Sequence, residues 1–245
     1  MRVSGCSDVG MLRSENQDAF AAVPLAKENT MLAIVCDGIG GEAGGKDAAD
    51  ICVRVFDERH KGKPLPTKDE LYRTLEEANK TVLSAAAEKG YARMATTAVA
   101  ARVTEEEVLI LWAGDSRAYL WHDGTLRRCT KDHSYVQALI EEGRLTEEEA
   151  VTHPYRNLIT RAVGAEETLL GDSVSLSWQT GDRLLLCTDG LTAMMGEKEI
   201  CEILSENMSL GVAVHELISA ANYHGGEDNI TVIVLENTKE STFDA

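Results

Sequence analysis

Aspartates placed where apolar segments end constrain this chain more than any other feature of its sequence. Leu32 to Cys36 is a continuous apolar run that stops at Asp37 and is followed by a cluster of glycines. Such a run, closed by glycine, is typical of a strand buried on both faces. A carboxylate at the mouth of a buried strand costs free energy unless a cation or a hydrogen-bond donor compensates it. Alone, the motif is equally compatible with an ordinary strand-to-helix turn.

The arrangement recurs three more times. Apolar segments run into Asp189-Gly190 and into Asp115, and Asp228 stands immediately before the apolar segment 230–235. Four aspartates at strand ends predict carboxylates that converge on hard cations such as Mg²⁺ or Mn²⁺, which prefer oxygen ligands. The six cysteines are scattered, with no Cys-x-x-Cys pair and no histidine at zinc spacing. A typical zinc site is therefore excluded.

Hydrophobic periodicity places strands in consecutive groups and helices in pairs. Two capping boxes, Thr67–Glu70 and Thr146–Glu149, mark helix starts. Strands are expected at 3–9, 19–25, 31–36, 96–103, 108–113, 117–121, 126–129, 174–178, 184–187 and 230–235. Helices are expected at 46–60, 67–89, 134–142, 146–153, 197–206 and 210–223, with a further one from Leu191. This order predicts an α+β fold with mainly antiparallel sheets, as one domain over 1–238 and a polar tail over 239–245.

Composition narrows the class of partner and compartment. The 245 residues are 44% hydrophobic, enough for one sizeable core, and the net charge is −17. This charge argues against nucleic-acid and anionic-membrane partners, which attract clustered Lys and Arg. Cysteines within apolar segments suggest buried thiols in a reducing compartment. No membrane span or signal peptide is recognisable, so a cytoplasmic protein is expected.

Carboxylate-bound ions of this kind support chemistry at phosphorus. Two ions about 3.5–4 Å apart can share a water, lower its pKa and stabilise an in-line displacement. The site then needs a cation that holds the incoming phosphate. Arg13 is the best candidate, because a guanidinium matches phosphate oxygens in a bidentate way.

Nine short segments, spread over nearly the whole chain, resemble the PPM (PP2C-type) metal-dependent protein serine/threonine phosphatases, and the compact bacterial members most closely. The resemblance implies a four-layer α-β-β-α sandwich of two mainly antiparallel sheets flanked by helices. The matching segments are Ser7-Asp-Val-Gly10 with Arg13 and Asn16-Gln-Asp18, Asp37-Gly-Ile-Gly-Gly41, Met94-Ala-Thr-Thr97, Gly114-Asp-Ser-Arg-Ala-Tyr119, Lys131-Asp-His-Ser134, His153-Pro-Tyr-Arg-Asn-Leu-Ile-Thr160, Thr188-Asp-Gly190 and Glu227-Asp-Asn-Ile-Thr-Val232.

The resemblance also implies a set of metal ligands. Asp37 would bridge two Mn²⁺ or Mg²⁺ ions, and the Gly38 carbonyl would ligate the first. Asp189 and Asp228 resemble ligands of the second ion. Asp115 matches the residue that, with Asp189, helps to hold a third and weaker ion in bacterial relatives.

Further roles follow from the same resemblance. Arg13 would bind the phosphate, Asp18 would orient metal-bound water from behind the ligands, and Asn229 would support its neighbouring ligand. The implied reaction is hydrolysis of phosphoserine and phosphothreonine in protein substrates by direct attack of a metal-bridging water, without a phosphoenzyme. A cognate bacterial Ser/Thr kinase and a monomeric state are expected by analogy.

Two positions depart from the family pattern. Gln17 stands where an acidic residue is frequent, and can still hydrogen-bond a metal water. Ile39 and Glu42 stand where relatives often carry the histidine that protonates the leaving group. Glu42 lies near the start of an expected helix, whose dipole favours the anion and makes it a poor proton donor. We therefore hypothesise that a metal-bound water protonates the leaving oxygen.

Several other polar residues are interpreted as structural. Arg117 is expected to pair with a carboxylate. His133 and His153 are expected to be structural residues that do not bind a metal. Arg156 and Arg161 either contact substrate or form surface salt bridges.

Three alternative functions are weighed against the phosphatase. A regulatory phosphatase acting on one phosphorylated anti-sigma antagonist would be distinguished by an added sensor domain. A non-catalytic binding module would be signalled by loss of Asp37, Asp189 or Asp228, and all three are present. A two-metal nuclease is disfavoured by the negative charge.

Overall fold

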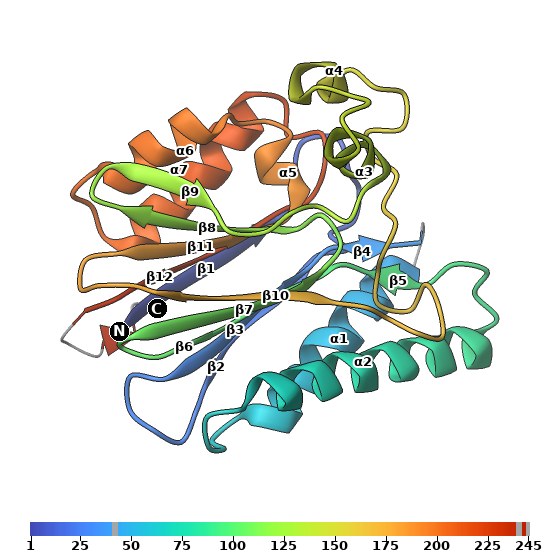
Figure 1. Ribbon diagram of the computed structural model, residues 1–245, viewed down its shortest axis with the longest axis horizontal. Coiled ribbons are helices and arrows are strands. Elements are labelled where there is room, and N and C mark those ends of the chain that lie inside the picture. The colour runs from blue at the N-terminus through green and yellow to red at the C-terminus, as the bar shows by residue number, and fades with distance from the viewer. Residues whose placement is uncertain (41–43, 239–241, 244–245) are drawn as a thin grey trace.

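The computed structural model describes residues 1–40, 44–238 and 242–243 of the chain. Two β-sheets pack face to face, and a pair of helices covers the outer face of each sheet (Figure 1). The predicted four-layer α-β-β-α sandwich is therefore confirmed. Both termini lie near one end of the sheets, on the left of Figure 1.

Within the described residues, the first large sheet has six strands. Its pairings are antiparallel except for the parallel contact between β1 and β13. In spatial order the strands are β13 (Thr242–Phe243), β1 (Arg2–Asp8), β12 (Ile230–Glu236), β11 (Arg183–Cys187), β8 (Arg117–His122) and β9 (Thr125–Arg128).

The second sheet has five strands in the part of the chain described here, and all of its pairings are antiparallel. In spatial order the strands are β10 (Asp172–Ser177), β7 (Glu107–Ala113), β6 (Ala98–Val103), β3 (Met31–Cys36) and β2 (Ala19–Pro24). A separate two-stranded ladder pairs β4 (Gly38–Ile39) with β5 (Ala95–Thr96).

The helices follow the capping signals in the sequence. Both predicted capping boxes form, at Thr67 with Glu70 and at Thr146 with Glu149. The helices are α1 (Gly44–His60) and α2 (Lys68–Lys89) on the five-stranded sheet, α6 (Glu197–Ser205) and α7 (Leu210–Tyr223) on the six-stranded sheet, and the short α3 (Tyr135–Glu141), α4 (Glu147–Val151) and α5 (Asp189–Thr192). Among the described residues, no helix is both long and apolar enough to cross a membrane.

The continuous apolar runs of the sequence follow from burial of the strands on both faces. In β3, Leu32, Ile34 and Cys36 pack toward α1 and α2. The alternate residues Ala33 and Val35 pack between the two sheets. Because side chains alternate across a strand, only a strand buried on both sides can be apolar at every position.

The strand ends that carry aspartates meet at one end of the sandwich. The end of β3 lies opposite the start of β2, and the start of β6 lies opposite the end of β7. In the other sheet, the end of β11 lies opposite the start of β8 and the first residues of β12. This is the end away from the chain termini, beside β4, α3 and α5 in Figure 1.

Two local predictions differ from the structure. Asp189 lies in the first turn of α5, so the helix includes this residue rather than starting at Leu191. The segment 96–103 is divided between β5 and β6 at Thr97. Thr97 leaves the sheet because its backbone N–H and side chain bind Asp37.

Candidate metal centre

The backbone of Asp37 is held in place by two neighbouring threonines. Its N–H donates to Thr97 Oγ1 at 2.9 Å, and its carbonyl accepts from the Thr97 N–H at 2.9 Å and from Thr96 Oγ1 at 2.8 Å. Thr97 Oγ1 is itself bonded to Ser116 Oγ at 2.6 Å, beside Asp115. The main chain of Asp37 is thus satisfied by protein groups, which leaves its carboxyl to other partners.

The carboxyls predicted to bind metal lie close enough to raise one another's pKa. Burial raises the pKa of Asp37 well above its ordinary value, and the charges of Asp189, Asp18, Asp115 and Asp228 raise it further. Burial followed by the charge of Asp228 raises the pKa of Asp189, against a hydrogen bond with Asp37. The pKa of Asp115 rises to about 8, mainly through burial and then through Asp189. The structure therefore brings together carboxyls that are spread from Asp18 to Asp228 in the sequence.

Several of these carboxyls carry an oxygen without a protein partner. Asp18, Asp115 and Asp189 each have a buried Oδ1 to which no group in the described part of the chain donates a hydrogen bond. Buried polar atoms are nearly always paired, and an unpaired carboxylate oxygen is costly. A divalent cation with its bound water would satisfy these oxygens, by direct contact at Asp115 and Asp189 and through the water at Asp18, and would relieve the mutual repulsion of the acids. The residues present fit the predicted ions on this evidence.

The described acids do not by themselves enclose an ion. In the described ranges, no group of three or more His, Cys, Asp or Glu side chains is arranged so that it could hold a metal ion. Mg²⁺ and Mn²⁺ sites of this class keep several waters and accept carbonyl oxygens. The carbonyl predicted as a ligand belongs to Gly38, which directly follows Asp37 and begins β4. A Cβ at Gly38 would lie 2.3 Å from the carbonyl oxygen of Gly45, so this close approach of two backbones requires glycine.

Asp18, Asp37, Asp115, Asp189 and Asp228 form the carboxyl cluster, and Arg13 lies at its edge. Its Nη2 donates to Asp228 Oδ2 at 2.8 Å, and its side chain is 56% exposed. A guanidinium has five N–H donors, so this ion pair leaves donors for a phosphate. Asn229 Oδ1 accepts from the Gln17 N–H at 2.8 Å, and its amide donates to the carbonyls of Val9 and Glu15 at 2.9 Å. Asn229 therefore ties the loop that carries Arg13 to Asp228, in agreement with its predicted supporting position.

Asp18 is held by hydroxyl groups that the sequence pattern did not single out. It is 3% exposed, and its Oδ2 accepts from Thr188 Oγ1 at 3.0 Å and from Thr231 Oγ1 at 2.7 Å. Burial raises the pKa of Asp18 to about 7, against these two hydrogen bonds. Thr188 directly follows the predicted strand 184–187 and Thr231 lies within the predicted strand 230–235, where threonine is an ordinary strand residue. Both belong to segments that match the family pattern, and that pattern gave neither of them a role.

The prediction that Arg117 pairs with a carboxylate is confirmed. Its Nε and Nη2 donate to the two oxygens of Asp132 at 3.1 and 2.8 Å, and Arg128 binds the same carboxylate. This pairing and the Asp132 charge raise the pKa of Arg117 against the effect of burial. The positive charge of Arg117 partly offsets the raised pKa of both Asp115 and Asp189. Arg117 is therefore held in place by Asp132, and its charge lowers the pKa values of Asp115 and Asp189 from there.

His133 and Arg161 also make structural contacts. His133 Nδ1 accepts from the Gly114 N–H at 3.2 Å, and its Nε2 lies 3.2 Å from Asp172 Oδ2. Arg161 forms a 3.4 Å ion pair with Asp172, which matches the salt-bridge alternative for this residue. Of the two positions where relatives often have histidine, Ile39 lies in β4, and Glu42 lies outside the described residues.

Comparison with known proteins agrees with this geometry. Residues 13–218 match the family model described as protein phosphatase 2C. The chain is 40% identical over 236 residues to a protein of Listeria monocytogenes named serine/threonine phosphatase stp, and the match covers 94% of this chain and 93% of the relative.

Solved structures are similar over nearly the whole chain. The serine/threonine phosphatase of S. agalactiae has 31% identity and a TM-score of 0.89, with 95% of this chain and 97% of that one covered. The catalytic domain of the serine/threonine protein phosphatase PstP, solved in complex with two manganese ions, has 31% identity and a TM-score of 0.83. That match covers 96% of this chain and 97% of the PstP domain.

Proposed function

This chain belongs to the protein phosphatase 2C family and is a serine/threonine phosphatase, and we propose that it hydrolyses phosphoserine and phosphothreonine in other proteins by direct attack of water. Mn²⁺ or Mg²⁺ is the proposed cofactor, as two core ions with a weaker third. The proposed biological role is to oppose a cognate Ser/Thr kinase, as a monomer. These finer assignments go beyond family membership.

One observation supports the proposal above the others. Carboxyls from both sheets meet at one end of the sandwich with raised pKa values and with buried oxygens that lack a protein partner. A protein that used these acids only for structure would pair them with cations of its own, because an unpaired buried charge destabilises the fold.

The proposed ligands divide between the ions. Asp37 would contact both core ions, Gly38 would supply a carbonyl to the first, and Asp189 and Asp228 would hold the second. Asp115 would share Asp189 with the third. When bound, such ions supply positive charge for the phosphoryl oxygens and lower the pKa of water at neutral pH.

The remaining steps are assigned to this chain's own residues. Arg13 would hold the phosphate by the N–H donors that its ion pair with Asp228 leaves free. It would thereby orient the phosphate against the end of the sandwich where the aspartates meet. Asp18, anchored through Oδ2 by Thr188 and Thr231, keeps its Oδ1 available to accept a proton from water and to orient it. Ile39 has no proton to give, so the proton for the leaving serine or threonine oxygen would come from water.

Hydrolysis of a phosphothreonine peptide tests the proposal. We expect turnover with Mn²⁺ that is abolished by EDTA and by Asp37→Asn. Asp123→Asn is the matched control, because Asp123 is an exposed residue of the β8–β9 turn with a φ of 44° that asparagine tolerates. Absence of turnover in the folded, Mn²⁺-loaded wild type would contradict the proposal and favour a binding module that retains the fold.

A further inference from the structure

The loop after β1 exposes two consecutive large apolar side chains. Met11 is 66% exposed and Leu12 is 71% exposed. Scattered apolar residues on a surface are ordinary, but an adjacent pair that could have been polar leaves apolar area in water. Neither residue belongs to the packed cores of the described chain.

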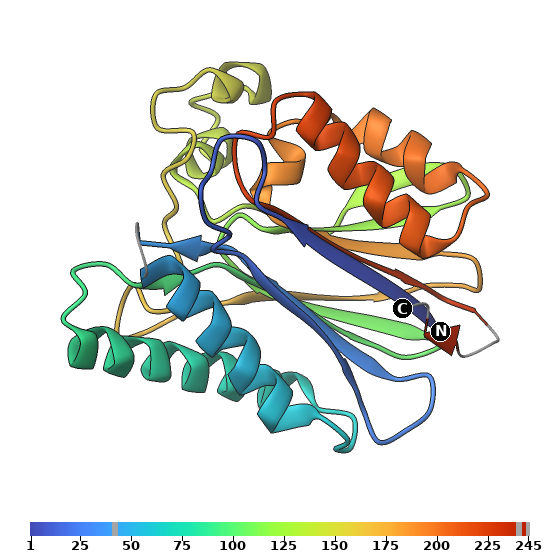
Figure 2. The same cartoon turned by 180° about the vertical axis from the view of Figure 1, so that it is seen from behind.

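This loop is held rigidly against the turn before β12. The N–H groups of Met11 and Leu12 both donate to the Gly226 carbonyl, at 2.7 and 3.3 Å. Gly10 has a φ of +78°, and a Cβ there would lie 2.2 Å from the Asp228 carbonyl oxygen. Figure 2 shows the loop after β1, in dark blue, beside the red segment that joins α7 to β12. The backbone of the loop is therefore anchored by protein contacts, and such anchoring lowers the entropy cost of binding.

The apolar pair lies directly beside the proposed phosphate contact. Arg13 follows Leu12 in the chain, and its guanidinium reaches Asp228 in the carboxyl cluster. An extended peptide advances about 3.3–3.6 Å per residue, and consecutive Cα atoms are about 3.8 Å apart. Leu12 and Met11 precede Arg13 by one and two residues, which is the same chain separation as that of a peptide side chain one or two positions from the phosphoresidue.

The charge around this loop disfavours acidic substrates. Glu15 and Glu227 are both exposed, and they lie on the two segments that hold the loop in place. The chain as a whole carries a net charge of −17. An acidic residue beside the phosphate would be repelled here, whereas an apolar residue would bury the exposed surface of the pair.

We propose that Met11 and Leu12 form a specificity surface that selects protein substrates with a large apolar side chain one or two positions from the phosphorylated serine or threonine. The inference rests on the proposed function, because it takes Arg13 as the phosphate contact. The bound segment is a phosphorylated stretch of another protein.

Steady-state kinetics on matched phosphothreonine peptides test this surface. The peptides differ only in carrying leucine or serine at the positions flanking phosphothreonine, on either side. The enzymes are the wild type, the double variant Met11→Ser with Leu12→Ser, and Val212→Ser as a control. Val212 is 52% exposed in the first turn of α7, at the opposite end of that helix from the turn that holds the loop. Leu12→Ser alone is a second variant, because Met11 also packs near Gly226.

For the wild type we expect kcat/KM for the better leucine peptide to exceed that for the serine peptide by about tenfold, mainly through KM. The ratio should fall to about twofold or less in the double variant, fall partly in Leu12→Ser and stay unchanged in Val212→Ser. A wild type without this preference, or a double variant that keeps it, would overturn the proposal.

Two further outcomes have separate meanings. A wild type that hydrolyses p-nitrophenyl phosphate but ignores the flanking residue refutes only the specificity surface. A folded wild type inactive on both p-nitrophenyl phosphate and peptides refutes the proposed function as well. Gel filtration tests whether a second copy of this chain binds the surface instead. A wild-type dimer that becomes monomeric in the double variant would assign the surface to such a copy and overturn the proposal.

Discussion

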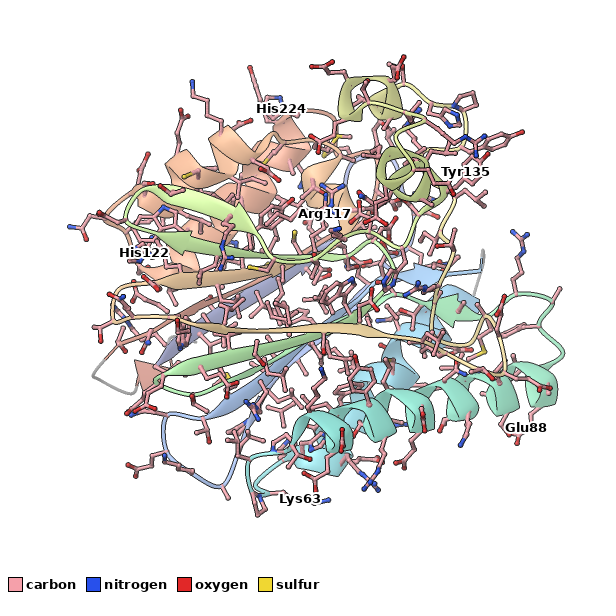
Figure 3. All side chains as sticks on the ribbon, viewed as in Figure 1. Lys63, Glu88, Arg117, His122, Tyr135 and His224 are labelled. Carbon is pink, nitrogen blue, oxygen red and sulfur yellow. The ribbon has the colours of Figure 1, made fainter. Side chains whose placement is uncertain are left out.

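The acids at the two ends of the sandwich differ in whether a cationic side chain pairs with them. At the end near the termini, Glu236 is 7% exposed and forms a 3.1 Å ion pair with Arg183, while Arg2 lies against its other oxygen. At the opposite end, neither Asp115 nor Asp189 forms an ion pair within the described residues, and each has a buried Oδ1 that accepts no hydrogen bond from the described chain. Arg117 and His122, the first and last residues of β8, mark the two ends in Figure 3.

The difference separates an acid that is ion-paired within the fold from the aspartates that we propose as metal ligands. We call the end with Glu236 and Arg183 the paired end and the end with Asp115 and Asp189 the unpaired end. Arg183 also donates to the Leu204 carbonyl at 2.6 Å and stacks on Trp121, so the paired end is joined to α6. Removing one partner of a buried pair leaves an uncompensated charge and is destabilising. The unpaired end has the reverse property, because its carboxylates repel one another and loss of one charge relieves that repulsion. The same change, acid to amide, should therefore act with opposite sign at the two ends.

The largest effect is expected from Asp189→Asn. Loss of a proposed metal ligand should lower kcat by about 10³-fold or more, since the charge that stabilises the phosphoryl group is lost. The same substitution removes a buried charge, so it should raise the unfolding free energy of the EDTA-treated protein by about 1–2 kcal/mol. Peptide turnover and denaturant unfolding in EDTA measure the two effects, with Asp123→Asn as control. A lower stability in EDTA would mean that Asp189 is a paired structural acid.

Glu236→Gln should have the opposite effect on stability. It leaves the charges of Arg183 and Arg2 without their carboxylate, and we expect a loss of about 3 kcal/mol in unfolding free energy. Metal-dependent turnover of the folded fraction should persist, because Glu236 lies at the end away from the carboxyl cluster. Glu202→Gln, an exposed acid on α6, is the control for urea unfolding. Stability equal to that of the control would break the distinction between the two ends.

Metal binding should stabilise only the unpaired end. Free Mn²⁺ at about 100 times its Kd should raise the unfolding free energy by about 2.7 kcal/mol, because the ion binds the folded chain and not the unfolded one. A thermal melt with and without Mn²⁺ should show the shift in wild type and in Glu236→Gln, but not in Asp37→Asn. A shift retained in Asp37→Asn would place the ion elsewhere.

Residue patterns were sufficient to predict an α+β fold with mainly antiparallel sheets and the convergence of the acids, and the family resemblance implied the sandwich. The apolar run before Asp37 implied a strand buried on both faces, and this prediction is confirmed because β3 packs on helices and on the other sheet. The β4–β5 ladder was missed, since two-residue strands have no periodicity and arise from the close approach of backbones. Thr188 and Thr231 were also missed. Their hydroxyls meet Asp18 only after strands distant in sequence are side by side.

The distinction between paired and unpaired acids could not be predicted from the sequence. Asp115 and Asp132 both stand near arginines in the chain. Only the fold shows that Arg117 and Arg128 bind Asp132 and that Asp115 keeps an unpartnered oxygen. Such a distinction depends on distances between side chains, which motif spacing does not contain.

The pH dependence of stability in EDTA should report on the unpaired end. Burial raises the folded-state pKa of Asp18 to about 7 and of Asp115 to about 8, above the ordinary value of a carboxyl in an unfolded chain. Their contribution is fully present below the unfolded pKa and is lost as pH rises through about 7 to 8, because the folded state must then release protons. We expect Tm in EDTA to fall as pH rises from about 5 to about 8 and to level off above that. Saturating Mn²⁺ should remove this fall, and a fall of equal size with Mn²⁺ would show that other groups cause it.

The smallest effect is expected from His60, which lies at the paired end. His60 is buried between α1 and α2, where its Nε2 lies 2.9 Å from Thr74 Oγ1, and burial lowers its pKa. A histidine with a lowered folded-state pKa contributes stability above the unfolded value of about 6.5, and this is lost as pH falls toward the folded pKa. A small fall in Tm below pH 6.5 should therefore occur equally with EDTA and with Mn²⁺, and should vanish in His60→Gln. Because its sign is opposite to that of the carboxyl cluster, one series of melts from pH 5 to 9 separates the two ends. A low-pH fall that Mn²⁺ abolishes would instead link His60 to the metal centre.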